Sequence, residues 1–192
     1  MHLIIYGPEG SGKGTQAAIL SQKLNLPIFT SGDLVRTAAE KDKGELGRAC
    51  REALKMGKYV PDQIMYRLWK NILGSKRAKK GFILDGFPRT LPQAKFLMQE
   101  TKKFGYSIDR IIYLKLSDEE AIKRLALRGR KLFAGSNINH DVVERVKERL
   151  KIYRSQEKEL LEFFRKVNLL SEVDAEKTVA EVADKIADIL PS

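Results

Sequence analysis

Hydrophobic positions along the chain follow two periods in alternation, one typical of buried strands and one typical of amphipathic helices. Short apolar runs predict five strands, at 3–6, 27–30, 82–86, 110–116 and 167–170. Apolar residues recur at helical spacing at 17–24, 46–56, 64–72, 94–98, 121–125, 142–150 and 179–190, and a further helix is expected to open at 31–33. Strands that alternate with helices predict an α/β fold, with a central five-stranded parallel sheet covered on both sides.

Composition adds the size and the compartment. A chain of 192 residues with 43% hydrophobic content is expected to form one domain with enough core to fold alone. No apolar run has the length that spans a bilayer, and no secretory signal is visible. Cys50 is the single cysteine, so an internal disulfide is impossible, and we expect it to pack inside a helix. These features predict a cytoplasmic protein.

Positive charge is in excess, with 36 Lys and Arg against 25 Asp and Glu and a formal net charge of +11. Such a chain can bind nucleic acid, an anionic surface or small phosphorylated substrates. One basic cluster, at 76–80, lies between a Gly-Ser turn and a glycine. We interpret it as a solvated loop face.

A second basic cluster, at 123–131, holds arginines at one-turn spacing and no acid. Arg124 and Arg128 are four residues apart, which places them on one face of a helix, and Arg130 follows. Three arginines without acidic partners repel one another unless a polyphosphate neutralises them. The alternative interpretation is a solvated basic helix end.

A glycine-rich stretch, GPEGSGKGT at 7–15, follows the first predicted strand and precedes the first predicted helix. This context is that of a phosphate-binding loop, in which backbone N–H groups and a helix N-terminus face the anion. Lys13 adds a full positive charge for the outer phosphates. Gly14 stands where such loops usually carry a magnesium-binding hydroxyl, and Thr15 comes one residue later. The alternative is a strand-to-helix turn with no ligand.

Asp85 ends the third predicted strand, at the sheet edge where parallel α/β folds gather their ligands. A carboxylate there is placed to hold magnesium, directly or through water. Arg89 follows an Asp-Gly turn and a proline, so its guanidinium can reach the same cleft and bind phosphate. With two histidines, one cysteine and scattered carboxylates, the chain shows no metal-ligand cluster.

The chain resembles the adenylate kinase family from residue 1 to about 190, through five motifs in the family's order and spacing. They are GPEGSGKGTQA, TSGDLVR, GKYVPD, FILDGFPRTLPQA and RLALRGR. The fourth is highly specific to this family and its close nucleoside-monophosphate kinase relatives. The resemblance implies a three-layer P-loop kinase fold with its core at 1–30, 61–128 and 141–192, a helical AMP-side segment at 31–60 and a short lid at about 129–140.

The same resemblance implies an activity, the reversible transfer of the γ-phosphoryl group of Mg²⁺-bound ATP to AMP, which gives two ADP. Positioning and positive charge carry such a transfer, and no general base is required when the acceptor is an anionic phosphate. The implied partners are ATP, AMP and ADP. We expect a monomer, with neither a membrane nor a nucleic acid as a partner.

Site residues follow from matching each motif position. ATP is expected to meet Gly10, Ser11, Gly12, Lys13, Gly14, Thr15, Arg124, Arg128 and the backbone of Lys177. AMP is expected to meet Ser31, Arg36, the backbone of Lys58, Tyr59 and Val60, and then Gly86, Phe87, Pro88, Arg89, Gln93, Arg130 and Arg149. The charges that act in catalysis would be Lys13, Arg89, Arg124, Arg128, Arg130 and Arg149. Asp85 would act on Mg²⁺ through water.

Three departures from the family pattern qualify these roles. Glu9 stands where relatives carry a small residue or proline, and we expect it to point outward because an acid repels phosphates. The lid lacks a cysteine tetrad, so it holds no zinc. Relatives also carry a lid arginine eleven residues before the position of Arg149, where this chain has Ile138. We expect Arg130 to fill that role.

Three other functions stay open on the sequence. A UMP/CMP kinase or a kinase with a relaxed acceptor is the nearest alternative, although Thr90 and Gln93 favour an AMP-type pocket. A nucleotide-dependent factor that binds RNA or DNA is more remote, because no aromatic-rich basic stripe and no nucleic-acid fold motif is present. A nucleotide-binding protein without turnover would follow if Ile138 marked a lost phosphate clamp.

Overall fold

Five parallel strands form one sheet in the order β2-β3-β1-β4-β5 in a computed structural model, which describes residues 1–56, 59–129 and 141–190. The strands are β1 (His2–Tyr6), β2 (Ile28–Thr30), β3 (Phe82–Asp85), β4 (Arg110–Lys115) and β5 (Leu170–Asp174). The helices are α1 (Lys13–Leu24), α2 (Ser31–Lys41), α3 (Glu45–Met56), α4 (Asp62–Leu73), α5 (Lys76–Lys80), α6 (Leu91–Lys103), α7 (Asp118–Arg128), α8 (Val143–Lys166) and α9 (Val179–Asp188). The predicted five-stranded parallel α/β fold is therefore confirmed.

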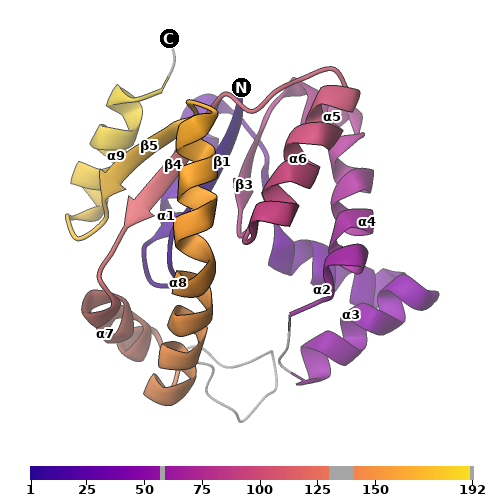
Figure 1. The fold of residues 1–192 in the computed structure, drawn as a ribbon, viewed down its shortest axis with the longest axis horizontal. Helices are drawn as coiled ribbons and strands as arrows, with labels where there is room; N and C mark the ends of the chain where they lie inside the picture. The colour runs from indigo at the N-terminus through magenta and orange to yellow at the C-terminus, as the bar shows by residue number, and fades with distance from the viewer. Residues whose placement is uncertain (57–58, 130–140, 191–192) are drawn as a thin grey trace.

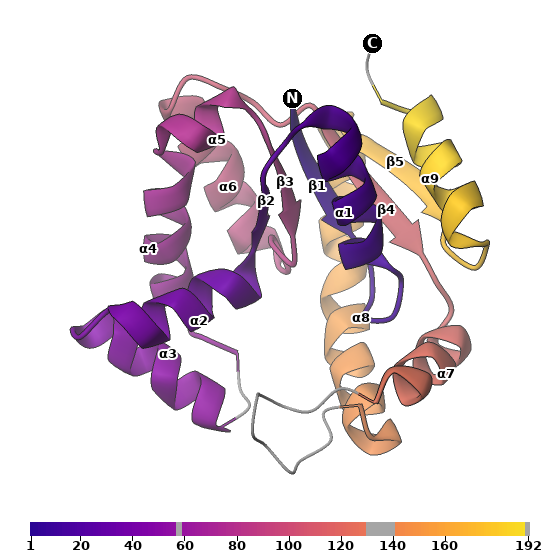
Figure 2. The ribbon, with the colours of Figure 1, turned by 180° about the vertical axis from the view of Figure 1, so that it is seen from behind.

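Two apolar clusters, one on each face of the sheet, hold the layers together. Alternate β1 residues divide between them, because side chains of a strand point to opposite faces. Ile4 packs with residues of α4, α6 and the second half of α8, whereas Ile5 packs with residues of α1, α7 and α9. Figures 1 and 2 show α8 and α6 on one face and α1 on the other. Cys50 is fully buried in the first cluster, as the sequence predicts, and so is Trp69.

The parallel arrangement gives the sheet two chemically different edges. All five strands run in one direction, so the C-terminal ends of β1, β2 and β3 lie together, and Asp85 pairs in register with both Ile5 and Thr30. The opposite edge carries the N-terminal ends of the strands, the end of α1 and the short helix α5. In Figure 1 α5 lies at the top and α7 at the bottom of the molecule.

The fifth strand is the least accurate prediction. The apolar run at 167–170 belongs mostly to the turn that ends α8, where Asn168 adopts a left-handed conformation with φ 55°. The strand is Leu170–Asp174, which pairs with β4 alone and forms an edge of the sheet. An edge strand needs few apolar residues, and only Val173 of its five is buried. Because most residues of β5 are polar, the strand does not stand out in the sequence as an apolar run.

One further segment differs from the expectations. The basic cluster at 76–80 is a helix and not a loop, since the Ser75 hydroxyl accepts a hydrogen bond from the Ala78 N–H and Ala78 is buried beneath it. Helix α2 is capped by Thr30, so Ser31 is its first residue. None of the helices within the described residues combines the length and the apolar character that crossing a bilayer demands.

Candidate nucleotide-binding site

The glycine-rich loop joins β1 to α1 at the C-terminal edge of the sheet. Gly7 has φ +150°, and a Cβ there would lie 2.7 Å from the carbonyl oxygen of Leu114, so no other residue fits without moving β4. Gly12 caps α1 in a left-handed conformation and offers no side chain to the first-turn N–H groups. Those N–H groups and the positive end of the helix dipole therefore face the loop, as an anion site requires.

Lys13 is folded back into its own loop. Its ammonium group donates hydrogen bonds to the carbonyl oxygens of Gly7 at 2.8 Å and Pro8 at 2.7 Å. Burial lowers the pKa of Lys13 to about 8, against the opposing effect of the Asp85 carboxylate. An anion in the loop would restore full protonation, so phosphate binding and proton binding are coupled at this side chain.

Asp85 is a partly buried carboxylate at the C-terminal edge of the sheet. Burial raises the pKa of Asp85, while Lys13 and Arg89 act in the opposite direction. Within the described ranges, none of its oxygens takes part in a hydrogen bond or an ion pair. Gly14 lies beside this carboxylate, since a Cβ on Gly14 would be 3.8 Å from Asp85 Oδ2, an ordinary van der Waals contact.

The turn after β3 gathers three of the predicted acceptor-side residues. The carbonyl oxygen of Gly86 accepts hydrogen bonds from Ser31 Oγ at 2.8 Å and from Arg89 Nε at 2.9 Å. The guanidinium of Arg89 also lies 4.5 Å from the ring centroid of Tyr59. Arg89 is exposed, and its two terminal nitrogens form no hydrogen bond or ion pair within the described residues, which leaves them available for an anion.

Gln93 and Arg36 are brought to the same side, although both are engaged in the present state. Gln93 is buried, accepts a hydrogen bond from the Arg89 N–H at 2.8 Å and donates one to Asp62 at 2.7 Å. Arg36 pairs with Asp33 at 2.7 Å in the first turns of α2. A nucleotide that uses either side chain must exchange these contacts for its own.

Arg124 and Arg128 of α7 do have acidic partners, contrary to the sequence expectation. Arg128 forms a bidentate pair with Asp141, at 2.8 and 2.9 Å, and the Asp141 side chain is fully buried. Arg124 pairs with Glu120 at 2.8 Å, one helical turn before it. Both carboxylates lie outside the cluster at 123–131. The lack of acidic residues within the cluster therefore did not mean that its arginines lack acidic partners.

Glu9 also differs from its expected outward orientation. Its carboxylate accepts a hydrogen bond from Arg149 Nε at 3.0 Å, across 140 residues of sequence. Arg149 NH2 lies 2.9 Å from Glu9 and 3.5 Å from Asp141. Glu9 is therefore paired with Arg149, the cation that the resemblance assigns to the transferring phosphoryl group. This pairing offsets the repulsion that we expected between Glu9 and the phosphates.

Arg124 connects two regions that the sequence assigns separately to ATP. Its NH1 group donates a hydrogen bond to the carbonyl oxygen of Ala175 at 2.9 Å, in the β5–α9 connection that includes Lys177. Ser117, at the start of the same helix, caps it but forms no capping box, because the Glu120 carboxylate binds Arg124 and Lys123. Ser117 instead contacts Glu176 of that connection at 2.6 Å.

Arg154 is a partly buried residue of α8 that the motifs did not indicate. It contacts Asp118 at 2.7 Å, Glu157 at 2.7 Å and the carbonyl oxygen of Leu116 at 2.7 Å. Glu157 also accepts hydrogen bonds from two tyrosine hydroxyls, those of Tyr113 and Tyr153. The network fixes α8 against the end of β4, one turn beyond Arg149. A basic residue on the apolar side of a helix was the available sequence signal.

The predicted site also includes residues that the structure does not describe. They are Lys58, Arg130, Ile138 and all but the first residue of the predicted lid.

Cations from separate segments lie around the glycine-rich loop, namely Lys13, Arg89, Arg128 and Arg149, an arrangement that fits the class of proteins that bind nucleotide phosphates. A family model described as adenylate kinase matches residues 5–169. An adenylate kinase of Thermobifida fusca is 37% identical over 192 residues, which is 100% of this chain and 99% of that protein. One from Archaeoglobus fulgidus is 34% identical over 216 aligned residues, covering 99% and 98%, and adenylate kinase 1 of a Nostoc species is 36% identical over 190, covering 99% and 98%.

The chain belongs to the adenylate kinase family. It is thus a transferase, an enzyme of nucleoside-monophosphate phosphotransfer. The alignment with the Archaeoglobus protein is longer than the 192 residues of this chain, so that relative has additional residues along its length.

Proposed function

We propose that the enzyme transfers the γ-phosphoryl group of Mg²⁺-bound ATP reversibly to AMP and produces two ADP. The observation that carries this proposal is the position of Asp85 between two sets of groups. The Lys13 loop lies on one side of it, and the turn with Arg89 and Ser31 lies on the other. One sheet edge thus offers a donor subsite and an acceptor subsite on either side of a single carboxylate.

Each group has a role that fits phosphoryl transfer. The loop N–H groups and Lys13 hold the outer phosphates of the donor, while Arg89 and Arg36 hold the phosphate of the acceptor. Arg128 and Arg149 supply charge to the equatorial oxygens of the group in transit. The gain comes from alignment and from preorganised positive charge, since the acceptor oxygen is already anionic.

Magnesium fits the donor side through Asp85. Its oxygens form no hydrogen bond or ion pair within the described residues. No group of three or more potential metal-ligating side chains occurs in the described part of the chain, which suits an ion held mainly by phosphates and water. The ion would neutralise charge on the β- and γ-phosphates.

The acids that hold the arginines fit the same scheme. Glu9, Asp141 and Glu120 neutralise arginines that otherwise would repel one another before the nucleotide binds. Phosphate groups then take over part of this pairing. The arginines complete the site best when both nucleotides are bound. Because the site is then occupied by the acceptor, transfer of the phosphoryl group to water, which is hydrolysis of ATP, is disfavoured.

The test offers Mg²⁺-ATP together with AMP, CMP, UMP or GMP and measures ADP formation. We expect efficient transfer to AMP and no more than a small fraction of that rate with the others. The Lys13→Met variant, prepared in parallel, should lose the activity and so exclude a contaminating kinase. Transfer only to CMP or UMP would reject the AMP assignment, and binding of nucleotides without any transfer would reject the kinase reaction itself.

A further inference from the structure

The edge of the sheet opposite the nucleotide site carries a concentrated positive charge. Helix α5 presents four exposed cations around the buried Ala78, namely Lys76, Arg77, Lys79 and Lys80. The sequence contains no acidic residue between Asp62 and Asp85. We call these four side chains the α5 patch. Because α5 precedes β3, the patch lies one strand length away from Asp85, roughly 15 Å for a strand of this size.

The α5 patch lacks the internal partners that the site arginines have. None of its four side chains forms an ion pair or a hydrogen bond within the described residues. Arg77 is nevertheless positioned, because its guanidinium lies over the ring of Phe29, 5.5 Å from the centroid. A stacked guanidinium keeps its N–H groups available for an anion. Among the residues that the structure describes, none supplies a counter-ion to this cationic surface.

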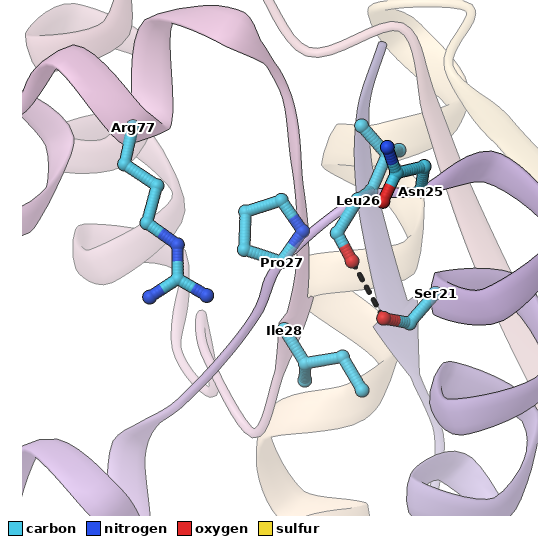
Figure 3. A pocket seen from close by; sticks show the side chains of 6 residues that line it. All are labelled: Ser21, Asn25, Leu26, Pro27, Ile28 and Arg77. Atoms are coloured by element: carbon cyan, nitrogen blue, oxygen red, sulfur yellow. Dashed lines mark hydrogen bonds between the residues drawn. The ribbon is translucent and has the colours of Figure 1, made fainter.

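A groove adjoins Arg77 on this edge. It measures about 450 Å³ and is lined by Ser21, Asn25, Leu26, Pro27, Ile28 and Arg77. Figure 3 shows Arg77 reaching toward Pro27 from one side, with Asn25 and Ser21 on the other. Ser21 Oγ donates to the Leu26 carbonyl oxygen at 2.6 Å, which leaves the exposed Asn25 carboxamide and the apolar wall of Pro27 and Ile28 for a ligand.

We propose that this edge binds single-stranded nucleic acid, with backbone phosphates on the α5 patch and one unstacked base in the groove. Arginine and lysine side chains without acidic partners are the usual contacts of a phosphodiester backbone. An apolar wall beside a carboxamide suits a base, which offers a flat face and a hydrogen-bonding edge. The groove has room for one nucleotide unit.

The same surface does not suit a membrane. The exposed large hydrophobic residues of the described chain lie elsewhere, and none belongs to α5 or to the α1–β2 connection. A lipid surface would call for apolar side chains that insert beside the cations. The proposal replaces the sequence interpretation of 76–80 as an unoccupied solvated face, and it adds a partner that the motifs did not predict.

The test measures fluorescence anisotropy of labelled 12-nucleotide RNA and DNA strands with saturating ADP present, so that the catalytic site is filled. Each cation that neutralises a phosphate of a single strand contributes about 0.7 to the salt slope, so four cations predict a slope near 2.8 and roughly fifty-fold weaker binding at 200 mM than at 50 mM salt. The variant with Arg77→Glu and Lys79→Glu should bind at least ten-fold more weakly and lose about half of that slope.

Matched controls separate position from net charge. The variant with Lys151→Glu and Lys158→Glu makes the same change in charge at exposed positions of α8 and should change the affinity less than three-fold. Both double variants should keep the turnover of ATP and AMP, which also reports that they fold. Asn25→Gly keeps the left-handed backbone, φ 53°, and should reduce the preference for single strands over a duplex.

Several results would overturn the proposal. Equal weakening in the two double variants would show a general charge effect, and full competition by ADP would place the oligonucleotide in the catalytic site. Duplex bound as tightly as single strand would reject the role of the groove. Binding to vesicles with 30% anionic lipid at the same salt concentration, without binding to either oligonucleotide, would assign the surface to a membrane instead.

Discussion

Nucleotide binding should take up a proton through Lys13. Burial sets the pKa of Lys13 near 8 in the structure without ligand, against an ordinary value near 10.5. A polyphosphate beside the ammonium group favours its charged form and raises the pKa again. If the pKa of Lys13 in the complex is well above 9, the affinity for the nucleotide is proportional to the protonated fraction of Lys13 in the free protein. That fraction is 1/(1 + 10^(pH − 8)). It then falls about two-fold from pH 7 to 8 and about ten-fold from pH 7 to 9, which is about 1.4 kcal/mol.

Isothermal titration calorimetry of ADP binding tests this coupling directly. Titrations at pH 7, 8 and 9, each in two buffers of different ionisation enthalpy, give the number of protons taken up. We expect about 0.1 proton at pH 7, about 0.5 at pH 8 and about 0.9 at pH 9. The Lys13→Met variant provides the control, since its binding should be weaker and nearly independent of pH. Proton uptake that persists in this variant would refute the reasoning, as would a wild-type affinity unchanged between pH 7 and 9.

The same shift has a consequence for the protein without ligand. The folded-state pKa of Lys13 is the lower one, so the unfolded chain binds more protons between about pH 8 and 10.5. The contribution of Lys13 to the free energy of unfolding therefore increases as the pH rises through that window. Below about pH 8 the side chain is charged in both states, and the cost of burying the charge destabilises the folded protein in full. The Lys13→Met variant should lack this gain in chemical denaturation at pH 8 and 10.

Three other substitutions test the site arginines. Glu9→Gln removes one acidic partner of Arg149, which also lies near Asp141, and should raise the affinity for ADP, whereas Glu148→Gln on the exposed face of α8 should not; equal affinities in calorimetry would contradict the pairing. Asp141→Asn removes a buried bidentate carboxylate and should lower the free energy of unfolding by about 1–3 kcal/mol in urea titrations, and an unchanged midpoint would count against its role. Arg130→Met should lower kcat by roughly 10²–10³ if this residue replaces the missing lid arginine, and unchanged turnover would reject that assignment.

Features encoded within a short window were predictable from the sequence. The strand, glycine loop and helix at 3–24 needed local rules alone, and so did Asp85 at the end of a buried strand. The family resemblance then ordered the scattered arginines into one site. Sequence patterns gave the correct sheet because four of its strands are rich in apolar residues, whereas the fifth lies at an edge and is half polar.

Features that depend on distant contacts were missed for a physical reason. The partner of Arg149 lies 140 residues away in Glu9, and no local pattern reports such a pair. The expectation for Glu9 considered repulsion from phosphates and overlooked a compensating cation. The contact between Ser31 and the Gly86 carbonyl oxygen, 55 residues later in the sequence, was likewise beyond local rules.

The carboxylates that pair with the site arginines also make the site selective for ligands that carry several negative charges. An anion that enters must compete with internal carboxylates that are already well placed, such as the buried Asp141. A monovalent anion can replace one of them at best, while a triphosphate and a monophosphate ester together meet several arginines at once. Chloride and acetate at cellular concentrations should therefore leave the site largely to nucleotides, and selectivity begins before any base is recognised.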